Sequence, residues 1–183
     1  MGQEGAGRTG PEGSIASGPA FLLFRIDDRL LHGQVALGWG GPLRPRTFVL
    51  ADETLARDPG AALLYEASAP DGTSVHVCRP EELPAWMRSP SADPAHAFLL
   101  VRSVPVAAEC LRRGVPGPVN LGGLHLRPDA RERLPYLFLT PEDERLLAEL
   151  AGEGVRFYAQ DLPGNPRRDL DAVIGDPPPG RSA

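Results

Sequence analysis

Short apolar segments alternate with segments of helical character along this chain, and this alternation constrains the fold more than any other feature. The apolar segments are four to six residues long, a length typical of buried strands. Strands that alternate with helices predict a mostly parallel sheet joined by right-handed crossovers. We therefore expect an α/β fold: a single-domain, three-layer α/β/α architecture with about seven strands and helices on both faces of the sheet. The expected strands cover residues 21–26, 47–51, 75–78, 97–101, 118–121, 136–139 and 155–159.

Between these strands the chain carries the signals that begin and end helices. The clearest is the run from Thr140 to Asp143, which combines an N-cap hydroxyl, a proline at the first helical position and an acid three residues after the cap. The sequence Glu153-Gly154 is expected to end this helix. Further helices are expected from residue 33, over 59–69, from residue 80 and over 105–113.

Three details of the layout also follow from the pattern. The wholly apolar segment 97–101 is expected at the sheet centre, because a strand covered on both faces has no polar side. The short link between Leu121 and Tyr136 allows one antiparallel strand. The glycine-rich residues 38–42 follow a helix and are expected to end it, so they do not form a nucleotide-binding loop.

Length and composition indicate one domain. A chain of 183 residues that is 42% hydrophobic can close a single core, which we place at residues 19–175. Residues 1–18 are rich in Gly, Ser and Glu and are expected to form a disordered leader, and residues 176–183 a flexible tail. The sequence contains no secretory signal and no stretch near the roughly 20 apolar residues that span a bilayer, so we expect a cytoplasmic protein.

Charge and cysteine content narrow the functional classes. The net charge is −5, and the basic residues, all of them arginine, form no cluster, which argues against binding to nucleic acid. Cys78 and Cys110 fall in an expected strand and an expected helix, and they are interpreted as reduced core thiols. No spacing of Cys, His or carboxylate residues indicates a metal site, and no cofactor is expected.

The candidate site is the segment from Asp27 to Gly33, which places His32 just after a strand and at the start of a helix. A helix N-terminus at the carboxyl edge of a sheet attracts anions. A neutral imidazole is already a nucleophile near pH 7, and phosphoryl transfer depends mainly on alignment and on stabilisation of the oxygens. His32 is therefore a candidate phosphoryl acceptor, although a lone histidine in a loop is more often an ordinary surface residue.

Several neighbours have candidate roles beside His32. Arg25 and Arg29, with Gly33 and Gln34 at the helix start, are expected to stabilise phosphoryl oxygens. Either Asp27 or Asp28 is expected to orient the ring or to fix an arginine, and both also suit plain roles as strand ends and helix caps.

Two further positions lie on the same sheet edge. Ser103 is expected either to donate to a phosphoryl oxygen or to cap the next helix. Gly122 and Gly123 either bring backbone close to the site or form a tight turn. His76 and His96 are interpreted as ordinary structural residues.

The segment RIDDRLLHGQV at residues 25–35 closely resembles the signature of the enzyme IIB subunits of the mannose/fructose/sorbose-type phosphoenolpyruvate-dependent sugar phosphotransferase system (PTS). The resemblance spans roughly residues 21–174 and preserves the order of its segments. These further segments are residues 49–53, 100–103, 114–116, 119–123 and 161–163.

The resemblance implies a function for the chain and a role for His32. It implies a protein-N(π)-phosphohistidine–sugar phosphotransferase in which His32, not His125, carries the phosphoryl group, with Arg25 and Arg29 as stabilisers. A phosphorylated IIA protein would be the donor, and the sugar would be held by the membrane subunits IIC and IID, so membrane contact would be peripheral and indirect. The resemblance implies the same parallel-rich sheet that the strand pattern predicts. It does not fix the oligomeric state, and a homodimer stays open.

Two other functional classes stay open at this point. One is a regulatory phosphocarrier or interaction module that is phosphorylated at His32 without delivering the group to sugar. The other is a nucleotide- or metabolite-binding α/β domain without phosphorylation, which the weak glycine signals support poorly.

Overall fold

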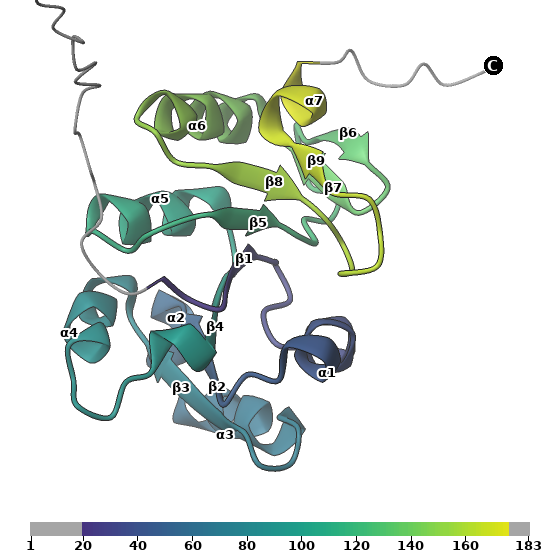
Figure 1. The fold of residues 1–183 in the computed structure, drawn as a ribbon. Coiled ribbons are helices and arrows are strands. Elements are labelled where there is room, and N and C mark those ends of the chain that lie inside the picture. The colour runs from purple at the N-terminus through teal and green to yellow at the C-terminus, as the bar shows by residue number, and fades with distance from the viewer. Residues whose placement is uncertain (1–19, 176–183) are drawn as a thin grey trace, which may run out of the picture.

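A seven-stranded sheet forms the middle layer of the protein, shown in Figure 1. The computed structural model describes residues 20–175, so the expectations for residues 1–18 and 176–183 lie outside the described part. The strand order is β3-β2-β4-β1-β5-β8-β9, and every neighbouring pair is parallel except β8 and β9. The strands are β1 (Leu23–Ile26), β2 (Thr47–Ala51), β3 (Ser74–Cys78), β4 (Ala97–Val101), β5 (Val119–Leu121), β6 (Arg131–Leu134), β7 (Leu137–Leu139), β8 (Phe157–Ala159) and β9 (Arg168–Asp169).

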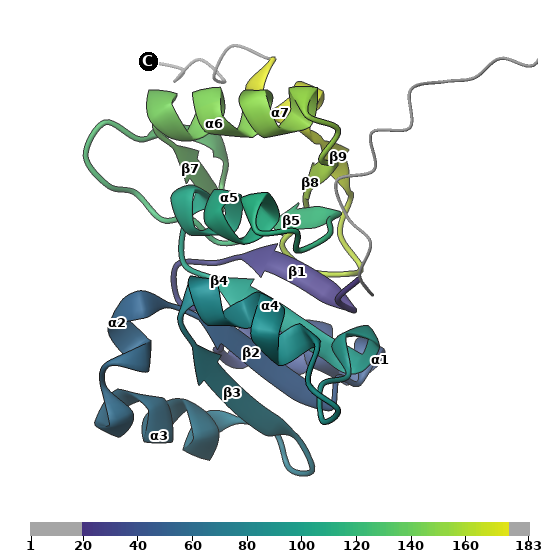
Figure 2. The same cartoon turned by 90° about the vertical axis from the view of Figure 1, so that its left-hand side faces the viewer.

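Helices cover both faces of this sheet, as the two views in Figures 1 and 2 show. The helices are the π-helical segment η1 (Gln34–Trp39), α1 (Gly40–Leu43), α2 (Glu53–Ala56), α3 (Pro59–Ser68), the 3-10 segments η2 (Pro80–Glu82) and η3 (Pro94–His96), α4 (Leu83–Met87), α5 (Val104–Arg112), α6 (Pro141–Gly152) and α7 (Leu170–Ile174). Helices α4, α5 and α6 pack on one face, whereas η1, α1, α2 and α3 pack on the other. Among residues 20–175, no helix is long and apolar enough to cross a membrane.

Alternating side chains along the strands divide the core in two. In β4, Leu99 and Val101 face the α5 side, whereas Phe98 and Leu100 face the η1 side. All five residues of β4 are buried because the strand lies between β2 and β1 with helices on both faces. The prediction of a three-layer fold with a central apolar strand is therefore confirmed, with β4 one place from the middle strand β1.

The region after β5 differs from the sequence prediction. Residues 131–134 and 137–139 pair as an antiparallel hairpin, β6–β7, in a separate two-stranded sheet. The expectation that 136–139 joins the main sheet is wrong, because the apolar residues Leu137 and Leu139 pack under α6 as part of a hairpin. The expectation that 155–159 is the last strand is also wrong. The two-residue strand β9 follows β8 and pairs with it, and this is the antiparallel pair of the main sheet.

Residues 38–42 also differ from expectation, because they do not end the first helix. The helical path runs from η1 directly into α1 and ends at Arg44, which has a left-handed backbone conformation. Gly38 lies against the Leu162 side chain, whose Cδ2 would have to shift if residue 38 carried a Cβ. The glycine therefore lets the loop after β8 approach the helix.

Two local predictions are confirmed. Thr140 caps α6: its hydroxyl accepts from the Asp143 amide at 3.1 Å, and Asp143 accepts from the Thr140 amide at 2.8 Å. Cys78 and Cys110 are free and buried, and burial raises the pKa of each thiol to about 12. They are packing residues of the core.

Replacing the α6 cap should measurably weaken the fold. Thr140→Ala removes the hydroxyl that accepts from the Asp143 amide, and we expect a loss of about 1 kcal/mol of unfolding free energy in urea denaturation. Thr54→Ala, at an exposed position inside α2, is the matched control and should change stability by less than about 0.5 kcal/mol. Equal stability of the Thr140→Ala and wild-type proteins would contradict the capping role.

Candidate functional site

His32 lies in the turn that joins β1 to η1, at the carboxyl edge of the sheet. Leu30 and Leu31 in this turn are both buried in the core. Leu30 adopts a left-handed backbone conformation, with φ of 55°. A leucine pays a steric cost in that conformation, and such strain is found mainly where the surrounding structure fixes a functional residue. The burial of these leucines fixes the path of the chain just before His32.

The imidazole of His32 contacts the carboxylate of Asp27. Nε2 of His32 lies 3.1 Å from Oδ1 of Asp27, and the His32 side chain is 16% exposed. The distance suits an ion pair, but the direction is not ideal for a hydrogen bond, and the buried Nε2 has no hydrogen-bond partner among the described residues. Catalytic hydrogen bonds are often poorly aligned before the reacting complex forms. Asp27 is therefore the residue that faces the ring from within the protein.

Asp27 forms a fully buried ion pair with Arg25. Oδ2 of Asp27 accepts from Nε and Nη2 of Arg25 at 3.1 and 2.9 Å, and both side chains are 0% exposed. Burial raises the pKa of Asp27, but contact with His32 and the charge of Arg25 outweigh it, so the pKa lies below its ordinary value of 3.8. The carboxylate that faces His32 is therefore ionised at neutral pH.

Arg25 is enclosed on all sides. Its Nη1 donates to Oδ1 of Asn120 at 2.5 Å and to the carbonyl of Gln160 at 3.0 Å, and its guanidinium lies 5.6 Å from the centre of the Trp39 ring. A Cβ at Gly122 would overlap the guanidinium, so glycine is required there. Burial lowers the pKa of Arg25, although Asp27 opposes the shift. Arg25 is thus buried behind Asp27 and holds that carboxylate, and it is not exposed to solvent beside His32.

Three other predicted residues lie at the solvent side of the turn. Arg29 is exposed, and its Nη2 lies 3.4 Å from Oε1 of Gln34. Gly33 is exposed, with space around its α-carbon, at the start of η1. The Arg29 amide donates to Oδ1 of Asp27 at 3.2 Å, which ties this turn to the buried carboxylate.

Asp28 points elsewhere, toward His125. It accepts from the backbone amide of His125 at 2.7 Å and lies 2.8 Å from the Nδ1 of that ring. Both belong to a neighbouring cleft of about 450 Å³. Of the two aspartates, the structure brings only Asp27 to His32.

Ser103 lies in the same neighbouring cleft and caps α5, with its Oγ 3.5 Å from the Val106 amide. Arg102 borders the cleft as well and donates to Asp52 at 2.8 Å and to the Asp28 carbonyl at 2.9 Å. The cleft lining does not include His32. The structure therefore supports the capping alternative for Ser103.

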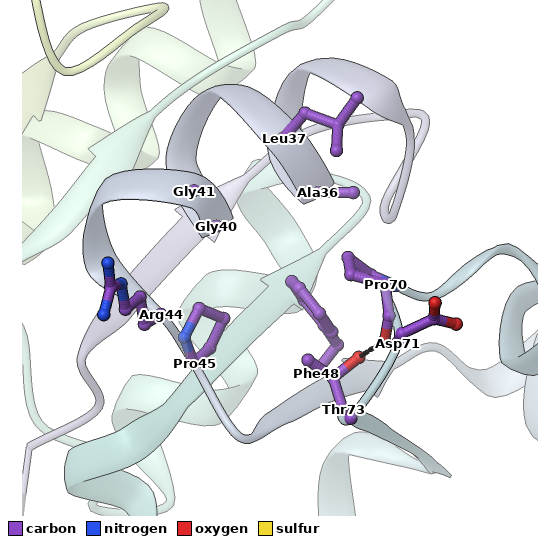
Figure 3. A pocket seen from close by; sticks show the side chains of 11 residues that line it. Ala36, Leu37, Gly40, Gly41, Arg44, Pro45, Phe48, Pro70, Asp71 and Thr73 are labelled. Carbon is purple, nitrogen blue, oxygen red and sulfur yellow. Dashed lines mark hydrogen bonds between the residues drawn. The ribbon is translucent and has the colours of Figure 1, made fainter.

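A second cavity, of about 330 Å³, lies on the η1–α1 side, as Figure 3 shows. The Phe48 ring, Pro45 and Pro70 line it, and Leu37 stands at its edge. Phe48 and Pro70 lie near the amino ends of β2 and β3, whereas His32 follows the carboxyl end of β1. This cavity is therefore separate from the His32 turn.

The sequence interpretation did not identify Trp39, Asn120 and Gln160 as residues of the site. Asn120 was a detectable signal, because it is a polar residue in an otherwise apolar strand. Trp39 depends on the π-helical turn, and Gln160 contributes a backbone carbonyl, so neither has a sequence signal of its own.

Comparison with known proteins identifies the family of this fold and site. The family model described as PTS system sorbose subfamily IIB component matches residues 21–177. The chain belongs to this family. It is 28% identical over 156 residues to the sorbose-specific EIIB component of Klebsiella pneumoniae, covering 85% of this chain and 88% of that protein. It is 26% identical to the N-acetylgalactosamine-specific IIB component 2 of Escherichia coli, covering 85% and 99%.

Solved structures share this fold. The IIB domain of the sorbose permease from Klebsiella pneumoniae superposes with a TM-score of 0.78 at 26% identity, covering 86% of this chain and 98% of that one. The protein manxB from Thermoanaerobacter tengcongensis gives a TM-score of 0.76 at 28% identity, covering 85% and 95%. The PTS relationship implied by residues 25–35 is thus confirmed.

Asp27 should make the stability of this IIB component depend on pH in the acid range. A carboxylate with a lowered pKa contributes stability above its ordinary value of 3.8, and the contribution is lost as the pH falls toward its folded-state pKa. Asp27→Asn should cost about 3–5 kcal/mol at neutral pH, because it leaves the Arg25 charge buried without its partner. The difference from wild type should shrink between about pH 5 and pH 2.

Urea denaturation across this pH range measures the difference. Asp71→Asn, at an exposed turn position, is the matched control and should follow wild type at every pH. A deficit of Asp27→Asn that stays constant down to the lowest pH would show that ionised Asp27 does not stabilise the fold.

Gly122 should tolerate no side chain. Gly122→Ala places a methyl group against the Arg25 guanidinium, and we expect a loss of about 1–3 kcal/mol of unfolding free energy. The control is Gly41→Ala, where a Cβ meets nothing within 4 Å. Because Gly41 lies in a helix, that change should be neutral or stabilising by about 1 kcal/mol. Similar stabilities for both variants would argue against the close approach of Gly122 to Arg25.

Proposed function

We propose that this IIB component accepts a phosphoryl group on Nδ1 of His32 from the phosphohistidine of a IIA protein and transfers it to a sugar. The sugar would be held by the membrane subunits IIC and IID, and the chain would work at the cytoplasmic side of the membrane through those partners. It would act as a protein-N(π)-phosphohistidine–sugar phosphotransferase.

The observation that carries this proposal is the orientation of the His32 ring. Nε2 is buried against the ionised carboxylate of Asp27, whereas the His32 side chain as a whole is 16% exposed, so its accessible surface lies on its other atoms. A carboxylate on one ring nitrogen keeps the proton there and leaves a lone pair on the other. The burial of Nε2 therefore supports Nδ1 as the nitrogen that receives the phosphoryl group.

The first transfer, from one histidine to another, needs no separate base. In the first step the bond between phosphorus and the donor histidine breaks, and a bond between phosphorus and Nδ1 of His32 forms, while the proton on Nε2 remains opposite Asp27. In the second step the bond between phosphorus and Nδ1 breaks, the sugar hydroxyl oxygen forms the new bond to phosphorus and releases its proton to water, and His32 returns to its neutral form. Asp27 thereby stabilises the positive ring that makes the phosphoryl group easy to release.

Arg29 is the residue that we assign to the phosphoryl oxygens. It is exposed beside the turn, and its guanidinium can form two parallel hydrogen bonds to a phosphate. The amides of Gly33 and Gln34 at the start of η1 are proposed to assist. Because Arg25 is fully buried and engaged with internal acceptors, we assign it to holding Asp27 in place.

The partner assignment draws on the names of the relatives. The mannose-specific EIIAB component of Escherichia coli is 24% identical to this chain, and the match covers 83% of this chain and 47% of that protein. That name joins the IIA and IIB functions in one component, so a IIA protein is the donor that we propose for this chain.

His32→Ala should abolish phosphoryl acceptance without unfolding the protein. The test mixes the purified protein with phosphoenolpyruvate, the general phosphocarriers and a matching IIA protein, and then maps an acid-labile, alkali-stable phosphoryl group. We expect it on His32 in the wild type and at no position in His32→Ala. His96→Ala is the control, because His96 is an exposed residue paired with Asp93, and it should be phosphorylated like the wild type.

Retained phosphorylation of His32→Ala would refute the assignment of His32. Membranes that contain IIC and IID extend the test: release of sugar phosphate supports transfer to sugar, whereas a stable phosphoprotein with no sugar phosphate would favour a regulatory phosphocarrier.

A further inference from the structure

We propose that Asn120 is a positioning residue that acts on His32 through Arg25 and Asp27. This inference deepens the proposed function and rests on the role assigned there to His32. Asn120 is 0% exposed and lies in β5. No contact between Asn120 and His32 is required, because the effect passes through two buried side chains.

The neighbours of Asn120 determine which way its amide faces. Its Nδ2 donates to the carbonyls of Tyr158 and Gln160, at 3.4 and 3.2 Å. Because Nδ2 faces these two carbonyls, Oδ1 of Asn120 faces Nη1 of Arg25, at 2.5 Å. The strand register brings these residues together, because Asn120 is paired with Arg25 in β1 and with Tyr158 in β8. An apolar residue would be favoured at a buried strand position, so the polar amide requires such partners.

Asn120 completes the set of acceptors around Arg25. Nε and Nη2 of Arg25 donate to Asp27, whereas Nη1 donates to Asn120 and to the Gln160 carbonyl. The guanidinium is planar and rigid, so the direction of Nη1 also fixes the direction of the other two donors. Loss of the Asn120 acceptor allows the whole group to turn toward the Gln160 carbonyl and away from Asp27.

Asp27 transmits the position of Arg25 to the ring. Oδ2 of Asp27 is held by Arg25 and by the Gly123 amide at 3.3 Å, and Oδ1 faces Nε2 of His32 at 3.1 Å. Rotation of the carboxylate therefore moves Oδ1 relative to the ring. When the phosphoryl group is on Nδ1, Nε2 carries a proton and positive charge, so the direction of Oδ1 then matters most.

The experiment measures the Nε2 proton of His32 directly. In protein with 15N-labelled histidine, we record the rate at which this proton exchanges with water, together with the amide exchange of β1 and β4. The variants are Asn120→Ala and Asn120→Ser, both of which lose the amide oxygen that accepts from Arg25, whereas the serine keeps a polar group at this buried position. Thr47→Ala is the control, since Thr47 lies at the amino end of β2 and contacts Ser74.

We expect both Asn120 variants to exchange the His32 Nε2 proton about tenfold faster while the strand amides keep their rates. The rate of phosphoryl acceptance should fall by about the same factor. Equal acceleration of the strand amides would indicate a purely structural role and overturn the proposal. An unchanged Nε2 rate in the variants, or an unprotected Nε2 proton in the wild type, would also overturn it.

The exchange measurement needs no phosphoryl donor. If the wild type accepts no phosphoryl group from a competent IIA protein, the proposed function fails, but the link from Asn120 to His32 is still decided by the exchange rates. If acceptance is normal and exchange does not respond to Asn120, the positioning role alone fails. The two results are therefore distinguishable.

Discussion

The buried ion pair between Arg25 and Asp27 is the interaction on which the arrangement around His32 depends. Removing two charges from water costs several kcal/mol per ion, and only close geometry with further hydrogen bonds offsets this. Both side chains are completely buried, and the Asn120 amide, the Gln160 carbonyl and the Gly123 amide supply the additional partners. These partners come from β5, from the loop that follows it and from the end of β8, so the pair requires the parallel order β1-β5-β8. The local chemistry of the turn is therefore tied to the topology of the whole sheet.

The layout of the fold could be predicted because most strands of the main sheet are largely buried on both faces and are therefore mainly apolar segments. Strands β2 and β4 have the residue ranges expected from the sequence. The same reasoning fails for β6, whose residues RERL are exposed or half-buried, and for β9, which is only two residues long. Their pairing is set by neighbouring segments in space, and a single strand of that kind has no distinguishing pattern of its own. Elements defined by burial were therefore predictable, whereas elements defined by pairing alone were not.

The site was predictable to a similar extent. The strand-to-helix turn placed His32 at the carboxyl edge, and Asp27 was one of two carboxylates expected to orient it. Strand alternation places Arg25 on the η1 side of the sheet with Leu23, two residues before it, and it is buried because β1 is covered on both faces. Proximity in sequence favoured a direct contact between Arg25 and phosphate instead. The part that no local pattern indicates is the π-helical turn of η1, which brings Trp39 over the guanidinium and its indole nitrogen to the Asp161 carbonyl at 2.7 Å.

The two adjacent aspartates show how burial separates residues of identical chemistry. Asp28 pairs with His125, but their side chains are 29% and 55% exposed, and ion pairs in contact with water contribute little energy. Its firm contact is the bond from the His125 amide, which holds the loop after β5 against the end of β1. Asp27 faces His32 in a setting with little water, where the same charge acts on the ring far more strongly. A charge that develops on an imidazole can be stabilised through Asp27, whereas Asp28 serves to keep the neighbouring loop in position. These two successive residues after β1 contact different neighbours, His32 for Asp27 and His125 for Asp28, and this difference assigns them to different tasks.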